Sequence, residues 1–248
     1  MQIDWTPLRT ELAACRRDGQ PVPFWWRDDD AIAPTAALDQ LTTLSEAVEL
    51  SVHLAIIPAH ATDDLVGHVD GTRLIPVVHG WTHQDHSAPG EKKNEFLTGR
   101  SDMASDSARG LSRMHDLFDA RLRHMFVPPW NRVRDTLLPT LSDQGFTALS
   151  TFGPRKNANA AHGLMQINTH IDPIWWKGTR DLVSPDTLVA TAVAHLSARR
   201  HGAEDAQEPF GLLTHHLVHT PAIWAFAQGF LNEMLSGGAT PWTMETTT

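Results

Sequence analysis

The sequence predicts one α/β domain, a distorted (β/α) barrel of about seven parallel strands. Short apolar runs that suit buried strands alternate with longer segments whose apolar residues recur at helical spacing. Neither a repeat nor a long linker divides the 248 residues. A doubly wound open sheet is the alternative arrangement. In both folds, a functional site lies at the carboxyl ends of the strands.

The predicted elements follow one another in a regular order. An N-terminal helix occupies residues 1–20 and carries Cys15, the one cysteine, which excludes an internal disulfide. The predicted strands are residues 21–26, 52–58, 73–80, 124–129, 147–153, 164–171 and 209–216. The predicted helices are residues 34–50, 101–123, 134–145, 184–200 and 221–235. The barrel domain therefore spans residues 21–236, and we expect residues 237–248 to form a flexible tail.

Charge and hydropathy narrow the possible partners. The formal net charge of −9 argues against nucleic acid or an anionic membrane as a partner. No apolar run is long enough to span a bilayer, and the first residues lack the apolar stretch of a signal peptide. We therefore expect a cytoplasmic protein, and its oligomeric state stays open.

Carboxylates and imidazoles collect directly after the predicted strands. They are Asp28, Asp29 and Asp30 after the first strand, His79, His83 and His86 after the third, His170 and Asp172 after the sixth, and His215, His216 and His219 after the seventh. Adjacent aspartates repel one another unless a cation is near. Two histidines and a carboxylate can hold a catalytic zinc ion, while a second carboxylate serves as general base and another histidine as general acid. The pattern predicts metal-assisted hydrolysis.

The order of these motifs resembles that of the polysaccharide deacetylases, the carbohydrate esterase family 4 type with the NodB-homology fold, over residues 22–216. "RDDDA" is similar to the family motif T-F-D-D-G. The resemblance implies that Asp29 is the general base and Asp30 a metal ligand, with Asp28 and Asp29 as the alternative register. "HGWTH" is similar to H-[ST]-x-x-H, which implies that His79 and His83 are the other two ligands.

The third family motif, R-P-P-Y, corresponds to "VPPWNR". Here Val127 stands where the family has an arginine that orients the base. Arg132 and Arg155 are the candidates to replace that arginine. The resemblance implies that Pro129 and Trp130 contact the substrate.

The last two motifs correspond to "DPIWW" and "LLTH". They imply that His215 is the general acid, that Leu213 lines a pocket for an acetyl methyl group, and that Asp172 with Trp175 or Trp176 borders the substrate. His216 stands where the family usually has an aspartate. Further candidate substrate contacts are Asp28, His86 and Arg132.

The predicted function is therefore a metal-dependent hydrolase that removes an acetyl group from an N-acetylated sugar or related small amide. A metal-activated water, an aspartate base and a histidine acid would carry the reaction. Zn²⁺ is the expected metal, and Co²⁺, Ni²⁺ or Fe²⁺ also suit two histidines and an aspartate. The expected substrate is a small molecule or an oligosaccharide. Two alternatives are an amidase acting on a non-sugar substrate such as a cyclic ureide, and a non-catalytic sugar-binding relic of the fold.

Overall fold

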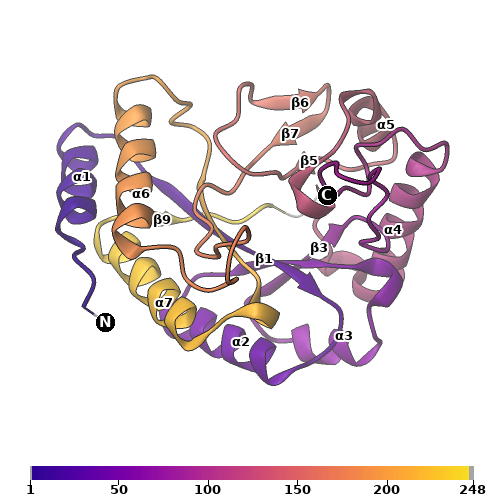
Figure 1. Cartoon of the computed structure of the whole chain (residues 1–248), viewed down its shortest axis with the longest axis horizontal. Coiled ribbons are helices and arrows are strands. Elements are labelled where there is room, and N and C mark those ends of the chain that lie inside the picture. Colours follow the sequence, from indigo (N-terminus) through magenta and orange to yellow (C-terminus); the bar gives the residue numbers. More distant parts are fainter. Residues whose placement is uncertain (1, 246–248) are drawn as a thin grey trace.

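The strands form one sheet that curls on itself and is surrounded by helices (Figure 1). The structure is a computed structural model that describes residues 2–245. The strands are β1 (Pro23–Ala31), β2 (Val52–Ile56), β3 (Leu74–His79), β4 (Met125–Val127), β5 (Ala148–Leu149), β6 (Asn159–Ala161), β7 (Leu164–Gln166), β8 (Phe210–Thr214) and β9 (Thr240–Pro241). The helices are α1 (Thr6–Arg17), α2 (Ala36–Val48), α3 (Asp64–Val69), α4 (Met103–Phe118), α5 (Leu138–Asp143), α6 (Pro185–Arg200) and α7 (Pro221–Ser236). Within residues 2–245, no helix is long and apolar enough to cross a membrane.

The strand order is β6-β7-β5-β4-β3-β2-β1-β8, and every pair in it except β6–β7 is parallel. The chain just after β7 brings the two ends of this order together. The His170 N–H donates to the Gly211 carbonyl and the Leu213 N–H donates to the Ile171 carbonyl, each at 2.8 Å. This confirms the predicted distorted barrel, and it places the ends of β1, β3 and β8 around one opening.

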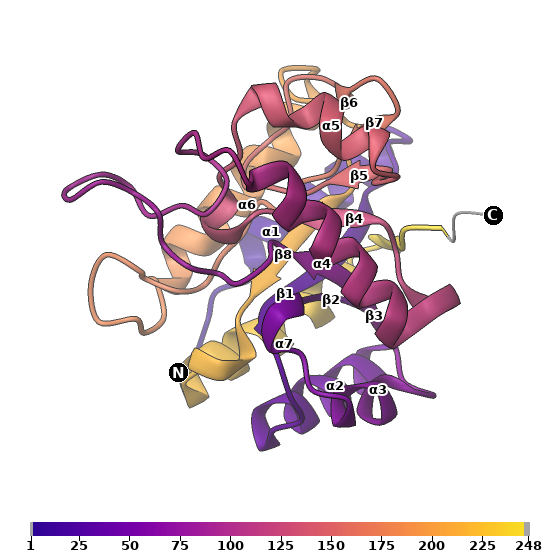
Figure 2. The same ribbon diagram turned by 90° about the vertical axis from the view of Figure 1, so that its right-hand side faces the viewer.

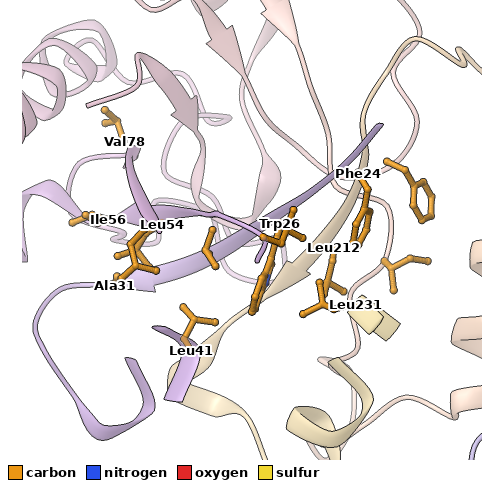
Figure 3. Packing of buried hydrophobic residues seen from close by; sticks show 14 of the residues in the cluster. Phe24, Trp26, Ala31, Leu41, Leu54, Ile56, Val78, Leu212 and Leu231 are labelled. Carbon is orange, nitrogen blue, oxygen red and sulfur yellow. The ribbon is translucent and has the colours of Figure 1, made fainter. Parts of the chain in front are cut away.

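Side chains alternate along β1 between the helix layer and the barrel interior. Phe24 and Trp26 pack on the outer face with residues of the large core cluster, among them Leu212 and Leu231 (Figure 3). Trp25 instead packs in a second cluster inside the barrel, with Val77. Continuing the alternation, Arg27 and Asp29 point inward, whereas Asp28 points outward.

The structure differs from the sequence-based expectation in several elements. β1 continues to Ala31 and so includes all three aspartates, whereas the predicted strand ended at residue 26. The short elements α3, β6 and β9 were not predicted. Sequence periodicity missed them because each spans two to six residues, too few to show a pattern.

The expected flexible tail is also different in the structure. Thr240 pairs with Pro23 on β1, and the Trp242 N–H donates to the Phe24 carbonyl at 2.8 Å. Met244 is buried in the inner cluster with Trp25. The segment therefore packs against the barrel up to Met244, because it supplies apolar side chains to the end opposite the polar opening. Residues 246–248 lie outside the described part of the chain.

Candidate metal centre and active site

Asp30, His79 and His83 converge at the carboxyl end of the sheet. Asp30 Oδ1 lies 3.1 Å from His79 Nε2 and 3.2 Å from His83 Nε2. The β1–β2 register shifts between Asp28 and Ala31, and Asp30 has a φ of 75°, a left-handed conformation that aspartate tolerates better than most residues. This irregularity turns the Asp30 carboxylate toward the two histidines.

The donor set fits a divalent cation. His79 Nδ1 donates to the Val127 carbonyl at 2.9 Å, which leaves Nε2 as the free nitrogen of the neutral ring. The Nε2 atoms of His79 and His83 and the Asp30 carboxylate oxygen then face one another. Too few N–H protons are present for each of these acceptor atoms to receive a hydrogen bond. Metal–ligand bonds of about 2.0–2.1 Å in tetrahedral geometry place ligand atoms about 3.3 Å apart, close to the observed spacing. The three residues therefore suit a zinc-type site.

The charges at this site favour the metal-binding protonation state at two of the three candidate ligands. Burial alone would raise the pKa of Asp30, but the hydrogen bond and the charge of His79 hold it well below its ordinary value. Burial lowers the pKa of His83, and the neighbouring His79 lowers it further. Burial would lower the pKa of His79 as well, but the carboxylates of Asp29 and Asp30 reverse that effect and raise it.

Asp29 and Arg27 form a buried bidentate ion pair inside the barrel. Arg27 Nε lies 2.8 Å from Asp29 Oδ1, and an Arg27 terminal nitrogen lies 3.0 Å from Asp29 Oδ2. The guanidinium also donates to Ser150 Oγ and to Asn131 Oδ1, both at 2.7 Å. A planar guanidinium held on several sides fixes the carboxylate in one orientation. Arg27 was not among the predicted site residues, although its two-residue spacing to Asp29 within a strand was a usable signal.

His215 approaches the same carboxylate from the end of β8. Its Nε2 lies 3.9 Å from Asp29 Oδ2, and its ring meets the edge of the Trp176 indole with 4.7 Å between centroids. Trp176 Nε1 donates to Asp172 Oδ2 at 2.7 Å. Burial raises the pKa of Asp172. The predicted general acid and general base are thus brought together, and His215 Nδ1 has no hydrogen-bond partner among residues 2–245.

Comparison with known proteins identifies the fold. The sequence matches neither a protein-family model nor a curated protein. The structure resembles a Mycobacterium smegmatis protein assigned as a polysaccharide deacetylase, with a TM-score of 0.63 and 13% identity over 93% of this chain and 96% of the other. The chain has the polysaccharide deacetylase fold.

Two further structures share this fold. One is a family 4 carbohydrate esterase from Streptomyces lividans in complex with acetate, with a TM-score of 0.55 and 12% identity, covering 91% of this chain and 94% of the other. The other is the peptidoglycan deacetylase PdaC from Bacillus subtilis, with a TM-score of 0.54 and 13% identity, covering 90% of this chain and 88% of the other. The fold class expected from the motif order is therefore confirmed.

The prediction that Asp28 contacts substrate is wrong. Asp28 is fully buried on the outer face of β1 and accepts hydrogen bonds from Thr214 Oγ1 at 2.6 Å and from the His216 N–H at 3.0 Å. His216 Nδ1 lies only 2.5 Å from Asp28 Oδ1. The alternative register, with Asp28 as base, would require the opposite face of the strand. His216, at the position where polysaccharide deacetylases usually have an aspartate, is instead the partner of Asp28.

The two arginines proposed to replace the family arginine do not reach Asp29. Arg132 donates to the Lys93 carbonyl, and Arg155 pairs with Asp205 at 2.8 Å. The arginine that pairs with Asp29 is Arg27, from the strand that carries Asp29 itself. Val127, at the family position, is buried inside the barrel.

A buried carboxylate holds the turn that carries His83. Glu95 Oε1 accepts from the Thr82 N–H at 2.8 Å and from Thr82 Oγ1 at 2.9 Å, and Oε2 accepts from the N–H groups of Trp81 at 3.3 Å and His83 at 3.2 Å. Glu95 is fully buried. Successive backbone N–H groups around one carboxylate form an anion-binding nest. No sequence pattern pointed to Glu95, because it lies in a loop that matches no motif.

Glu95 also explains why Gly80 replaces the hydroxyl residue of the family motif. Gly80 has a φ of 58°, and a Cβ atom there would collide with Glu95 Oε2 and with the ring of Pro129. Both the backbone conformation and the close approach therefore require glycine. Pro129, a predicted substrate contact, is buried against this turn.

The remaining predicted site residues lie around the opening. The Trp130 ring lies 4.3 Å from the His83 ring, centroid to centroid. Leu213 is buried in β8 and precedes His215 by two residues. His86 is half-buried in the loop between β3 and α4, and Trp175 is 53% exposed in the segment before α6. Figure 2 shows these two segments projecting from the same side of the molecule.

Proposed function

We propose that this protein is a metal-dependent hydrolase that removes an acetyl group from an N-acetylated sugar or a related small amide. The observation that supports this most is the convergence of Asp30, His79 and His83 beside the Asp29–Arg27 pair and His215. Zn²⁺ is the metal that suits this donor set best in a hydrolase, and Co²⁺, Ni²⁺ and Fe²⁺ are the other candidates.

A divalent cation bound by the three ligands would polarise the amide carbonyl and lower the pKa of an attacking water. Asp29 would accept the proton of that water, with Arg27 holding the carboxylate in place. His215 would donate a proton from Nε2 to the departing nitrogen as the C–N bond breaks, which yields acetate and an amine. The distance of 3.9 Å between His215 Nε2 and Asp29 Oδ2 supports this assignment, because both groups would have to reach the same reacting carbon.

The surroundings suit a sugar that carries an acetyl group. Leu213 offers an apolar wall for the acetyl methyl, and the rings of Trp130 and Trp176 flank His83 and His215. An aromatic face is a good surface for the apolar side of a pyranose ring. Trp176 is 41% exposed and hydrogen-bonded through its indole nitrogen to Asp172, so it is both accessible and held in position.

Metal content measured on the purified protein and on His83→Ala tests the first half of this proposal. We expect about one divalent ion per chain in the wild type and loss of that ion in the variant. Absence of metal from both proteins, even after zinc is added back, would refute a metal-dependent function.

The rate of substrate hydrolysis tests the second half of the proposal, the deacetylation itself. Release of acetate from N-acetylglucosamine oligomers should be abolished in Asp29→Asn, which should keep its metal because Asp29 is not a ligand in the proposal. The substrate panel should include a cyclic ureide. Hydrolysis of the ureide alone would assign the protein to the amidase alternative, and metal binding without any hydrolysis would favour the sugar-binding relic.

A further inference from the structure

The hydrogen bonds of the Asp28 side chain all come from the two residues on either side of His215. The Asp28 carboxylate accepts from Thr214 Oγ1 at 2.6 Å, from the His216 N–H at 3.0 Å and from His216 Nδ1 at 2.5 Å. Within residues 2–245 it has no other hydrogen-bond partner, and His216 Nε2 has none at all. Asp28 therefore holds the chain directly before and directly after the proposed general acid.

The backbone pairing of β1 with β8 ends just before His215. In the parallel register Asp28 lies beside Thr214, and this is the last pair of the two strands. The His215 N–H does not bond to β1 but donates to His219 Nε2 at 3.3 Å. Burial lowers the pKa of His219 to about 4, so its ring is neutral at pH 7 and can accept that bond. The direction in which the chain leaves β8 at His215 therefore depends on side chains rather than on the sheet.

This direction sets the distance between the proposed acid and the proposed base. Asp29 directly follows Asp28 on β1, and Arg27 holds its carboxylate inside the barrel. His215 directly follows Thr214, and its Nε2 lies 3.9 Å from Asp29 Oδ2. A misplacement of about 1 Å in a reacting group can lower a rate about 100-fold. A group that fixes residues 214 and 216 therefore has a direct effect on the position of the acid.

Packing alone does not explain a carboxylate at this position. Phe24 and Trp26 share the outer face of β1 with Asp28, and both are apolar and pack in the large core cluster. Asp28 is fully buried, and removing a carboxylate from water is strongly unfavourable unless its partners compensate. An apolar side chain would fill the same space without that penalty. The partners of Asp28, rather than its volume, are what distinguish it from its neighbours on the strand.

We propose that Asp28 is the positioning residue of the general acid and holds the turn of residues 214–216 so that His215 faces the reacting centre. The proposal rests on the proposed function and deepens it, because it gives each of the three consecutive aspartates a separate part of the site. In this arrangement, Asp30 is the metal ligand and Asp29 is the base that accepts the proton of the attacking water. Asp28 touches no reacting atom and acts only through His215.

The leaving group of the substrate distinguishes this role from a purely structural one. An amide nitrogen must be protonated as the C–N bond breaks, whereas 4-nitrophenolate leaves 4-nitrophenyl acetate without a proton. In zinc-loaded Asp28→Ala, kcat for N-acetylglucosamine oligomers should fall about 10- to 100-fold with KM nearly unchanged. Hydrolysis of the ester by the same protein should change by less than about 3-fold. His215→Ala is the reference variant, because it should lower the ratio of amide to ester turnover in the same way.

Two milder substitutions keep the test valid if Asp28→Ala does not fold. Thr214→Val keeps the shape of the side chain but removes one of the three bonds, and it should lower the amide-to-ester ratio in the same direction. Asp28→Asn can keep all three contacts, because its Nδ2 can donate to His216 Nδ1 in the other tautomer of the ring. Amide turnover by Asp28→Asn should therefore be close to the wild-type rate. An Asp28→Asn protein as slow on the amide as Asp28→Ala would contradict a hold through hydrogen bonds.

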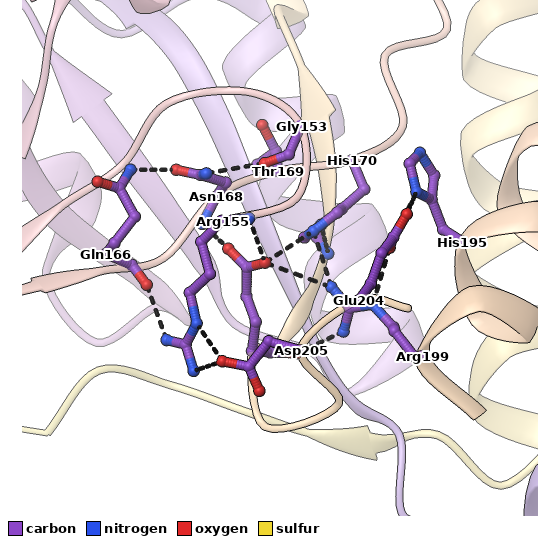
Figure 4. A network of polar contacts seen from close by, with 12 residues as sticks. Gly153, Arg155, Gln166, Asn168, Thr169, His170, His195, Arg199, Glu204 and Asp205 are labelled. Atoms are coloured by element: carbon purple, nitrogen blue, oxygen red, sulfur yellow. Dashed lines mark hydrogen bonds and ion pairs between the residues drawn. The ribbon is translucent and has the colours of Figure 1, made fainter. Parts of the chain in front are cut away.

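Glu208→Ala is the matched control. Glu208 is also a fully buried carboxylate, but it lies before β8, at the end of that strand opposite to His215. Its carboxylate lies 3.3 Å from His170 Nε2 and 3.6 Å from an Arg199 nitrogen, within the separate polar network of Figure 4. Loss of this carboxylate should change amide and ester turnover by the same factor.

Hydrogen–deuterium exchange separates failure of this inference from failure of the proposed function. In Asp28→Ala the backbone amides of residues 214–219 should exchange at least about 10-fold faster than in the wild type, because hydrogen bonds to a charged group are lost. Those of residues 79–83 should stay unchanged. Faster exchange confined to residues 214–219 supports the hold on His215, even if the wild type hydrolyses no amide and the proposed function fails. Unchanged exchange there, or equal loss of amide and ester turnover in Asp28→Ala, overturns the positioning role.

Discussion

Replacing Glu95 with glutamine should release the turn that carries His83 while leaving the side-chain volume almost unchanged. The carboxylate accepts four hydrogen bonds, two at each oxygen. A glutamine amide has one oxygen, so its nitrogen must face backbone N–H groups in either orientation. In one orientation of the amide, the Thr82 N–H loses its acceptor. In the other orientation, the N–H groups of Trp81 and His83 lose theirs.

The size of the effect follows from the burial of this carboxylate. Hydrogen bonds to a charged group contribute about 1.5–3 kcal/mol each, and a buried donor left unpaired costs about 1–3 kcal/mol. The two bonds at Oε2 are long, at 3.2 and 3.3 Å, which favours the lower end of that range. We expect Glu95→Gln to lower the free energy of unfolding by about 2–4 kcal/mol. Loss of an outer support of His83, a proposed metal ligand, should also weaken zinc binding about 10- to 100-fold.

Two measurements check this prediction. Urea unfolding of the chelator-treated protein gives the stability without metal, and calorimetric titration gives the zinc affinity. Glu91→Gln is the matched control, because Glu91 is exposed in the same loop and should change stability by less than about 0.5 kcal/mol. An unfolding midpoint and zinc affinity equal to the wild type in Glu95→Gln would refute the role assigned to the nest.

Two other substitutions and the pH dependence of stability test the structure at separate points. Arg27→Met leaves the buried Asp29 carboxylate unpaired and should cost about 3–5 kcal/mol of stability, measured by urea unfolding. Gly80→Ser restores the family residue but should destabilise the protein and weaken zinc binding, because a Cβ there collides with Glu95. Burial lowers the pKa of His53 to about 4. The unfolded chain, with a His pKa of about 6.5, therefore binds the proton first, and about 3 kcal/mol of stability is lost as the pH falls from about 6.5 through about 4.

One control uses a residue of the same kind in other surroundings, and another removes the titrating group itself. Arg132→Met removes an arginine whose one side-chain hydrogen bond within residues 2–245 goes to the Lys93 carbonyl, and it should leave stability nearly unchanged. His53→Gln should flatten the part of the pH profile assigned to His53. A Gly80→Ser protein as stable as the wild type, or a His53→Gln profile as steep as that of the wild type, would contradict the corresponding argument.

The sequence was enough to predict the alternating architecture and the polar opening. Strands separated by helices must run parallel, and the carboxyl ends of parallel strands lie on the same side of a barrel. Residues that directly follow β1, β3 and β8 are therefore brought together whatever the details of packing. For this reason the motif order alone predicted the meeting of Asp30, His79 and His83, and the approach of His215 to Asp29.

Only the tertiary structure decided which groups support these residues. A shift of one residue moves a side chain to the other face of a strand, so the continuation of β1 to Ala31 determines that Arg27 and Asp29 point inward and that Asp28 points outward. Glu95 supports His83 through the path of a loop, which follows no periodic pattern. The sequence by itself therefore determined the parallel direction of the strands and the convergent side chains, because both follow from chain connectivity. The arginine, the nest and the packed C-terminal segment depend on exact register and loop path, which long-range packing sets.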